Sequence, residues 1–248
     1  MSVATFRALH HDRPAGDPLV LPGPWDATSA RVFADAGFPA LATPSRAVTE
    51  SLGYEDGGLI PPGEMFAAIR RIAGAVDIPV SADVEHGYGL PPCELVERLL
   101  DAGVVGCNLE DTAHPGTTLR DAGEQADFLA AVRAAAGEEL FVNARIDTFA
   151  HGDKETGPAV ERGRRYAEAG ADCVYPILCP PGALRALADG IGLPVNALAL
   201  PDGPAPHELG HQGATRVTFG PGLHRRATAA LRAIAAELGG AGAPRPEG

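Results

Sequence analysis

Short apolar runs typical of strands alternate along the chain with longer segments in which apolar residues recur at helical spacing. This alternation predicts a series of strands, each followed by a helix. The predicted strands are residues 19–21, 40–43, 79–83, 104–110, 140–147, 173–178, 194–198 and 216–220. The predicted helices are residues 27–36, 62–75, 92–102, 123–136, 156–169, 181–189, 205–212 and 223–238.

Eight strand–helix units in 248 residues favour an α/β fold, a closed (β/α)8 TIM barrel. Glycines at four predicted helix ends agree with this reading, because glycine ends a helix at positive φ without steric cost. They are Gly37, Gly103, Gly170 and Gly213. A doubly wound open sheet is the alternative, but residues 22–26 (Pro-Gly-Pro-Trp-Asp) do not form the GxGxxG turn that this fold places after its first strand.

No linker divides the chain, so residues 1–248 are expected to form a single barrel domain, with residues 1–16 and 239–248 as frayed tails. Residues 222–238 are apolar on more than one face, which suggests a helix buried against another subunit. We expect neither a signal peptide nor a membrane span, because no run of 18 apolar residues is present.

Composition narrows the function classes. Twenty basic residues stand against 32 acidic ones, a net charge of −12, which argues against binding to nucleic acid. The four cysteines lack CxxC spacing and are expected to be reduced thiols in a cytoplasmic protein. The only lysine, Lys154, lies in a polar stretch, which argues against Schiff-base chemistry because that chemistry needs a desolvated lysine.

Polar side chains gather where three predicted strands end, and in a barrel the chemistry takes place at that edge. Residues two apart on a strand share a face. The groups expected on common faces are Asp83 with Glu85, Asn108 with Glu110, and Asn143 with Arg145 and Asp147. If these faces point inward, acids, amides and an arginine converge on one opening.

Several carboxylates so close together repel one another unless a cation neutralises them. Oxygen ligands without a His or Cys cluster suit Mg²⁺, or Mn²⁺, better than zinc. Arg145 would offer a bidentate fork to a carboxylate or phosphate of the substrate. The acids could instead cap helices or form surface ion pairs, an alternative that remains open above all for Asp111 and Asp147, and His86 and His114 could be solvated loop residues.

The motifs resemble the isocitrate lyase/phosphoenolpyruvate mutase superfamily in order over about residues 19–238. The resemblance rests on Trp25-Asp26-Ala27, residues 51–57 (Ser-Leu-Gly-Tyr-Glu-Asp-Gly), residues 82–89 (Ala-Asp-Val-Glu-His-Gly-Tyr-Gly), Asn108-Leu109-Glu110-Asp111, Asn143-Ala144-Arg145 and Pro194-Val195-Asn196. It implies a (β/α)8 barrel, a Mg²⁺ ion and a small 2-oxo acid or its enolate. It also implies a homotetramer, a dimer of dimers in which a C-terminal helix is exchanged between subunits.

The resemblance also implies roles for single residues. Asp83 would anchor the metal, and Glu85 and Glu110 would complete its shell, partly through water. Arg145 would hold the substrate's carboxylate or phosphoryl group. Trp25 would form a wall of the pocket, and Thr43 and Ser45 would lie in a turn that offers backbone N–H groups to the substrate. Arg46 would face either a second anionic group or solvent, and Asn196 would also bind the substrate. Asp56 would be a catalytic residue in a mobile stretch near the substrate.

Departures from the family pattern limit the reaction. Family lyases that cleave isocitrate or methylisocitrate carry a cysteine in the loop after the fourth strand, whereas residues 110–121 contain none. The phosphonate-processing members use Lys and Asn in that loop, and both are absent. The proton donor stays open between His114 and Tyr54.

The expected function is a Mg²⁺-dependent carbon–carbon lyase or decarboxylase of a small 2-oxo or 2-hydroxy dicarboxylate, acting through a metal-bound pyruvate-type enolate. One alternative is P–C chemistry of the phosphoenolpyruvate mutase or phosphonopyruvate hydrolase type. The other is a non-catalytic barrel that binds 2-oxo acids.

Overall fold

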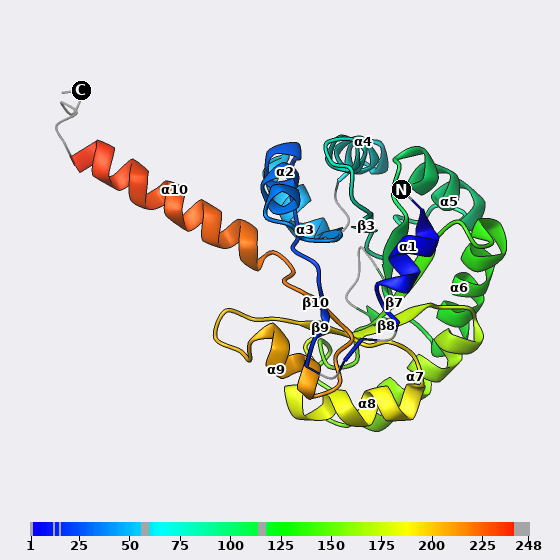
Figure 1. Ribbon diagram of the computed structural model, residues 1–248. Coiled ribbons are helices and arrows are strands. Elements are labelled where there is room, and N and C mark those ends of the chain that lie inside the picture. Colours follow the sequence, from blue (N-terminus) through cyan, green and yellow to red (C-terminus); the bar gives the residue numbers. More distant parts are fainter. Residues whose placement is uncertain (1, 12, 15, 56–59, 114–117, 241–248) are drawn as a thin grey trace.

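The computed structural model describes residues 2–11, 13–14, 16–55, 60–113 and 118–240. Within these residues, eight parallel strands surround a central axis and helices form an outer ring (Figure 1). The strands are β1 (Leu19–Val20), β2 (Leu41–Thr43), β3 (Val80–Asp83), β4 (Gly106–Glu110), β7 (Phe141–Ile146), β8 (Cys173–Pro176), β9 (Asn196–Leu198) and β10 (Arg216–Thr218). Each lies inside a range predicted from the sequence.

The strands close into a barrel in chain order. Strands β2-β3-β4-β7-β8 form one hydrogen-bonded group, and β1-β10-β9 form another. A parallel bridge between Val174 and Val195 joins β8 to β9. On the other side, the amide of Ala42 donates to the carbonyl of Pro22 at 3.2 Å and joins β2 to the end of β1. The (β/α)8 barrel is therefore confirmed, and the open doubly wound sheet is excluded.

The outer helices begin and end close to their predicted limits. They are α2 (Ala27–Asp35), α4 (Pro62–Ala73), α5 (Pro92–Asp101), α6 (Ala122–Ala136), α7 (Thr156–Glu168), α8 (Leu184–Ile191) after a 3-10 turn (Pro181–Ala183), α9 (Pro206–His211) and α10 (Gly222–Gly240). The four glycines predicted at helix ends all have φ between 79° and 114°. Local hydrogen bonds and prolines determine where several helices begin. Asp26, at the N-cap of α2, accepts from the amide of Ser29 at 2.7 Å, and prolines occupy the first positions of α4 and α5.

The N-terminal segment corrects the sequence interpretation, which assigned residues 1–16 to a frayed tail. Residues Val3–Ala8 form helix α1, and the side chain of Phe6 is fully buried against the barrel. The ring of His10 stacks on Phe141 with 4.2 Å between centroids. The side chain of Arg7 forms an ion pair with Asp172 at 3.0 Å. Helix α1 and His10 therefore pack against the hydrophobic core of the barrel and are not a frayed tail.

Two further elements escaped the sequence pattern. Helix α3 (Ser45–Ser51) follows β2 directly, and a small antiparallel hairpin pairs β5 (Thr112–Ala113) with β6 (Thr118–Leu119). The apolar core lies between the strands and the surrounding helices, and buried side chains from α4, α5, α6 and α7 contribute to it. Both elements lie next to the carboxyl ends of strands, where they shape the opening of the barrel.

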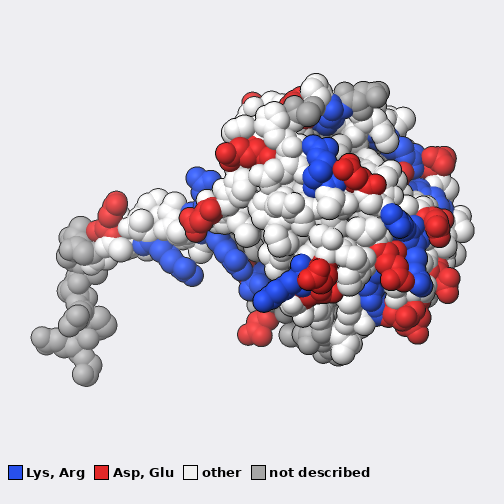
Figure 2. Space-filling view, turned by 90° about the horizontal axis from the view of Figure 1, so that it is seen from below, with Lys and Arg blue, Asp and Glu red and all other residues white. Residues whose placement is uncertain are grey.

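Helix α10 leaves the barrel and extends away from it, as Figures 1 and 2 show. Residues 239–240 belong to this helix, so its end lies beyond the expected start of the C-terminal tail at 239. Three apolar side chains on it are exposed, Leu231 by 65%, Ile234 by 51% and Leu238 by 72%. In the part of the chain that is described, no helix combines the length and apolar character needed to cross a membrane. On the face seen in Figure 2, basic and acidic side chains are interspersed.

Candidate active site

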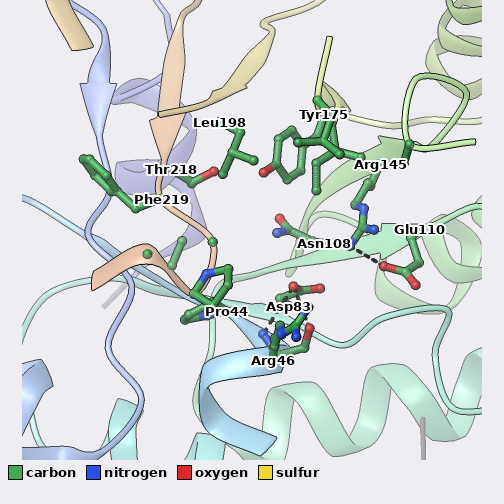
Figure 3. Close-up of a pocket in the computed structure, with 18 of the residues that line it drawn as sticks. Pro44, Arg46, Asp83, Asn108, Glu110, Arg145, Tyr175, Leu198, Thr218 and Phe219 are labelled. Atoms are coloured by element: carbon green, nitrogen blue, oxygen red, sulfur yellow. Dashed lines mark hydrogen bonds and ion pairs between the residues drawn. The ribbon is translucent and has the colours of Figure 1, made fainter. Parts of the chain in front are cut away.

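A cavity of about 780 Å³ opens at the carboxyl ends of the strands. Thr43, Asp83 and Glu110 line it, and each is the last residue of its strand. Figure 3 shows Asp83, Glu110 and Arg145 pointing toward the same space from β3, β4 and β7. The chain thus brings the expected metal-binding acids and the expected substrate arginine to one opening, as strand alternation predicted.

Asp83 is fixed by the segment that follows β2. Its Oδ2 accepts from the hydroxyl of Ser45 at 2.9 Å and from the Ser45 amide at 3.3 Å, and its own amide donates to Thr43 Oγ1 at 3.3 Å. Ser45 and Thr43 were expected to serve the substrate through backbone N–H groups. Both line the cavity, but in this structure the Ser45 amide and hydroxyl and the Thr43 hydroxyl hold the end of β3.

Glu85 reaches the cavity by a route that strand alternation does not describe. Strand β3 ends at Asp83, and Glu85 adopts a left-handed backbone with φ 52°. The sequence argument placed Asp83 and Glu85 on one strand face, and that step was wrong because the strand had already ended. Both side chains nevertheless line the same cavity, and the Glu85 amide donates to Asp83 Oδ1 at 3.3 Å.

Arg145 lies between two acids. Its Nη1 forms an ion pair with Glu110, which pairs with it in register across β4 and β7 (Figure 3). Its Nε and Nη2 donate to the two carboxylate oxygens of Asp147 at 2.7 and 3.1 Å. Burial alone would lower the pKa of Arg145, but the carboxylates of Glu110 and Asp147 outweigh burial and raise the pKa, so the guanidinium stays charged. The guanidinium of Arg145, expected to bind the substrate, therefore already binds Asp147 and Glu110, and only its remaining N–H groups can bind a substrate anion.

An amide layer lies behind these charges. Asn143 Nδ2 donates to Asn108 Oδ1 at 2.8 Å, and Arg216 Nη2 donates to the same oxygen at 3.3 Å. Asn108 lines the cavity, whereas Asn143 and Arg216 are fully buried. Asp111, which the sequence left open between site and structure, is a structural acid: it accepts from Tyr166 at 2.7 Å and pairs with Arg162 at 3.1 Å.

Several expected site residues lie elsewhere. Trp25 does not line the cavity, and its ring packs against His224 with 5.1 Å between centroids. Asn196 is also absent from the cavity wall: it is fully buried, and its Oδ1 accepts from Thr218 at 3.2 Å. Tyr54, one of the two candidate proton donors, does not line the cavity. Its hydroxyl donates to Glu64 Oε1 at 2.7 Å. Asp56 and His114 lie outside the described residues.

The sequence reading missed other residues of the cavity wall. His151 follows β7, and Arg225 and Arg226 come from the first turns of α10. Together with Arg46, whose Nε pairs with Glu50 at 3.0 Å, these arginines give the opening a basic rim. The signal was the arginine pair at residues 225–226, two residues beyond the Gly-Pro-Gly segment at residues 220–222. His151 carried no comparable signal because it stands in a polar stretch.

The donor set fits a hydrated magnesium ion. Asp83, Glu85 and Glu110 offer hard carboxylate oxygens in one cavity. Within the described ranges, no three His, Cys, Asp or Glu side chains are placed to hold one ion directly. Mg²⁺ keeps several of its waters in protein sites, so Asp83 could hold it directly and the two glutamates through water.

Comparison with known proteins places this chain in a family. Residues 6–239 match the family model of phosphoenolpyruvate phosphomutase. The chain belongs to the isocitrate lyase/phosphoenolpyruvate mutase superfamily. This confirms the resemblance inferred from the motifs.

Individual members of the superfamily align over most of the chain. A proposed phosphonomutase from Burkholderia cenocepacia has a crystal structure that superposes with a TM-score of 0.88 at 40% identity, covering 94% of this chain and 98% of that one. An uncharacterised protein of Mycobacterium tuberculosis is 35% identical over 220 residues, 87% of this chain and 81% of the relative. The 2-methylisocitrate lyase of Bacillus subtilis is 30% identical over 203 residues, 78% of this chain and 66% of the relative. The superfamily thus includes lyases and mutases.

Proposed function

We propose that this chain is a Mg²⁺-dependent carbon–carbon lyase or decarboxylase that acts on a small 2-oxo or 2-hydroxy dicarboxylate. The observation that carries the proposal is the convergence of Asp83, Glu85, Glu110 and Arg145 on one cavity at the carboxyl ends of the strands. The basic rim supports a substrate with a second anionic group. The absence of a cysteine in residues 110–121 argues against the tricarboxylate cleavage named for the Bacillus relative.

In this proposal the acidic residues would hold the metal ion and the arginines would bind the substrate. Asp83 would hold the ion, with Glu85 and Glu110 acting through water, and the bound ion would supply Lewis acidity toward the keto oxygen of the substrate. Arg145 would bind the carboxylate next to that keto group through the N–H groups that its acid partners leave. Arg46, Arg225 and Arg226 would orient the second anionic group at the rim.

For a 2-oxo substrate, such an arrangement fits a reaction in which a bond at C3 breaks. The electron pair of that bond moves toward C2, and negative charge collects on the keto oxygen to give an enolate. In a decarboxylation, the C4 carboxylate leaves as carbon dioxide. In a retro-aldol cleavage, the other fragment leaves as an oxo acid or aldehyde after the C4 hydroxyl has given its proton to water. Arg145 is held rigidly between Glu110 and Asp147, so its charge is in place before the reaction and needs little reorganisation.

Purified protein tests this proposal with a panel of oxaloacetate-like and malate-like diacids in the presence of Mg²⁺. We expect release of pyruvate, another 2-oxo acid, or carbon dioxide, and loss of that activity with EDTA or in Asp83→Ala. Asp77→Ala removes an exposed acid far from the cavity wall and should leave the activity unchanged. Turnover that persists without a metal would refute the proposal.

P–C chemistry is the second candidate, and the match to the phosphoenolpyruvate phosphomutase model favours it. The loop at residues 110–121 weakens it because the expected Lys and Asn are absent. Phosphorus NMR of the protein mixed with phosphonopyruvate separates the two: a new phosphorus resonance supports this candidate.

A non-catalytic 2-oxo-acid-binding protein is the remaining alternative. Thermal stabilisation by Mg²⁺ with oxalate, without turnover of the diacids or of phosphonopyruvate, would support it.

We also propose that helix α10 packs against another copy of the chain in a homotetramer. Its exposed Leu231, Ile234 and Leu238 would cost free energy in water at roughly 25 cal/mol for each Å² of apolar surface. Burial against a second copy removes that cost. The rim residues Arg225 and Arg226 lie on the same helix, so assembly would also fix one wall of the cavity.

A further inference from the structure

A short hydrogen-bonded chain runs from the cavity wall to the Arg145 ion pair. His151, in the segment after β7, lies on that wall, and its Nε2 is 3.0 Å from Thr112 Oγ1. The Thr112 hydroxyl is 2.5 Å from Asp147 Oδ2. Asp147 accepts two hydrogen bonds from Arg145. Thr112 of β5 therefore connects the imidazole to a buried, arginine-bound carboxylate that directly follows β7.

The direction of each hydrogen bond follows from the chemistry of the groups. An ionised carboxylate only accepts, so the single proton of the Thr112 hydroxyl points to Asp147. The hydroxyl oxygen can then only accept from His151, which requires a proton on Nε2. In the neutral imidazole, Nδ1 is consequently unprotonated and available as a base, and in the charged imidazolium it carries a proton to give.

We propose that His151 is the catalytic acid–base residue that exchanges a proton with C3 of the substrate-derived enolate, while Thr112 and Asp147 are positioning residues. This inference rests on the function proposed above. In the forward step, the enolate's electron pair forms the new C–H bond, the keto group is restored, and the Nδ1–H bond breaks with its electrons left on nitrogen. Water then returns a proton to the imidazole.

Other groups near the reaction space are poorer proton donors. Cys107 and Cys173 do not line the cavity, and burial raises the pKa of each thiol to about 12. Tyr175 does line the cavity, but burial raises the pKa of its phenol to about 12 as well. A general acid works best when its pKa lies near the working pH, which disfavours these two thiols and this phenol.

The test is hydrogen–deuterium exchange of the methyl group of pyruvate in D₂O with Mg²⁺, followed by proton NMR. This partial reaction needs no knowledge of the natural substrate, because only proton removal and return at C3 are required. We expect the wild-type chain to exchange the methyl protons. In His151→Gln the amide can still donate to Thr112 but cannot carry a proton, so exchange should slow by at least ~100-fold.

Matched variants separate catalysis from folding and binding. His207→Gln changes an exposed histidine on α9 and should exchange at the wild-type rate. Thr112→Val breaks the connection and should lower the exchange rate without changing the pyruvate concentration at half-maximal rate, whereas Thr112→Ser should restore exchange. Thermal stabilisation by Mg²⁺ plus oxalate should be the same in wild type and His151→Gln, because oxalate binding needs no proton transfer.

Each outcome bears on one of the two proposals. If His151→Gln exchanges at the wild-type rate, the assignment of His151 is overturned. If Tyr175→Phe loses exchange while His151→Gln keeps it, the proton belongs to Tyr175. Loss of oxalate stabilisation in His151→Gln would make the residue a binding group and also overturn the assignment, as would a wild type that binds Mg²⁺ and oxalate but exchanges nothing. A wild type that neither binds them nor exchanges contradicts the proposed function itself.

Discussion

The stability of this protein should depend on pH through a histidine far from the cavity. His10 is 1% exposed, its Nδ1 lies 2.8 Å from the carbonyl of Phe6, and its ring stacks on Phe141. The hydrogen bond to a carbonyl requires a proton on Nδ1, and Nε2 is buried without a hydrogen-bond partner. Burial, reinforced by the nearby charge of Arg216, lowers the pKa of His10 from 6.5 to about 3.

The sign and size of the effect follow from proton linkage. The native state excludes a proton that the unfolded chain binds once the pH falls below about 6.5. The stabilising contribution is therefore fully present above that pH and is lost as the pH falls toward about 3, at roughly 1.4 kcal/mol per pH unit. Between pH 7.5 and 5.5 the expected loss from this one residue is about 1.4 kcal/mol.

Urea unfolding at fixed protein concentration measures this loss directly. His10→Phe keeps an aromatic ring against Phe141 and removes the titrating group, so its free energy of unfolding should fall about 1.4 kcal/mol less than that of the wild type over this pH interval. The lost hydrogen bond to Phe6 shifts the whole curve of the variant but not its slope. His207→Gln, at an exposed position, should keep the wild-type slope. Parallel curves for wild type and His10→Phe would refute the buried, neutral imidazole.

Three further perturbations have expected outcomes. Gly163→Ala would place a Cβ 2.5 Å from the Ile191 side chain and should lower the free energy of unfolding by about 1–3 kcal/mol in urea melts. The control is Gly157→Ala on the same helix, whose Cβ meets no atom within 4 Å and which should raise the free energy of unfolding by up to about 1 kcal/mol. Arg145→Met leaves two buried carboxylates without their counter-charge and should cost about 3–5 kcal/mol in the same assay. Leu231→Glu on α10 should reduce the molar mass measured by light scattering; an unchanged mass contradicts assembly through α10.

The barrel was predictable because its determinants are local. Apolar periodicity marks each strand and helix, and four glycines mark helix ends whose φ values require them. Helix α1 was not predictable on the same basis, because a six-residue helix is unstable alone and two histidines follow it. Its stability comes from tertiary burial of Phe6 against Phe141, a contact 135 positions away that no local pattern reports.

The candidate site was predictable where it depends on strand ends. Asp83, Glu110 and Arg145 were found because alternation fixes which way a strand residue points. Glu85 was placed by the same rule, although its position follows from a left-handed backbone that the rule does not describe. His151 was missed because its relevance rests entirely on its contact with Thr112, across 39 positions of sequence.

Charge compensation shows most clearly what a sequence pattern leaves undecided. Alternation brings Glu110, Arg145 and Asp147 to one face, but it cannot say whether the acids turn to a metal ion or to the guanidinium. In this structure both acids pair with Arg145, so a buried positive charge already offsets part of the negative charge in the cavity. An ion therefore meets Glu110 as a carboxylate whose charge is already partly offset. The arginine that was expected only to bind substrate thus also sets how strongly the cavity attracts a cation, and both roles depend on the same register between β4 and β7.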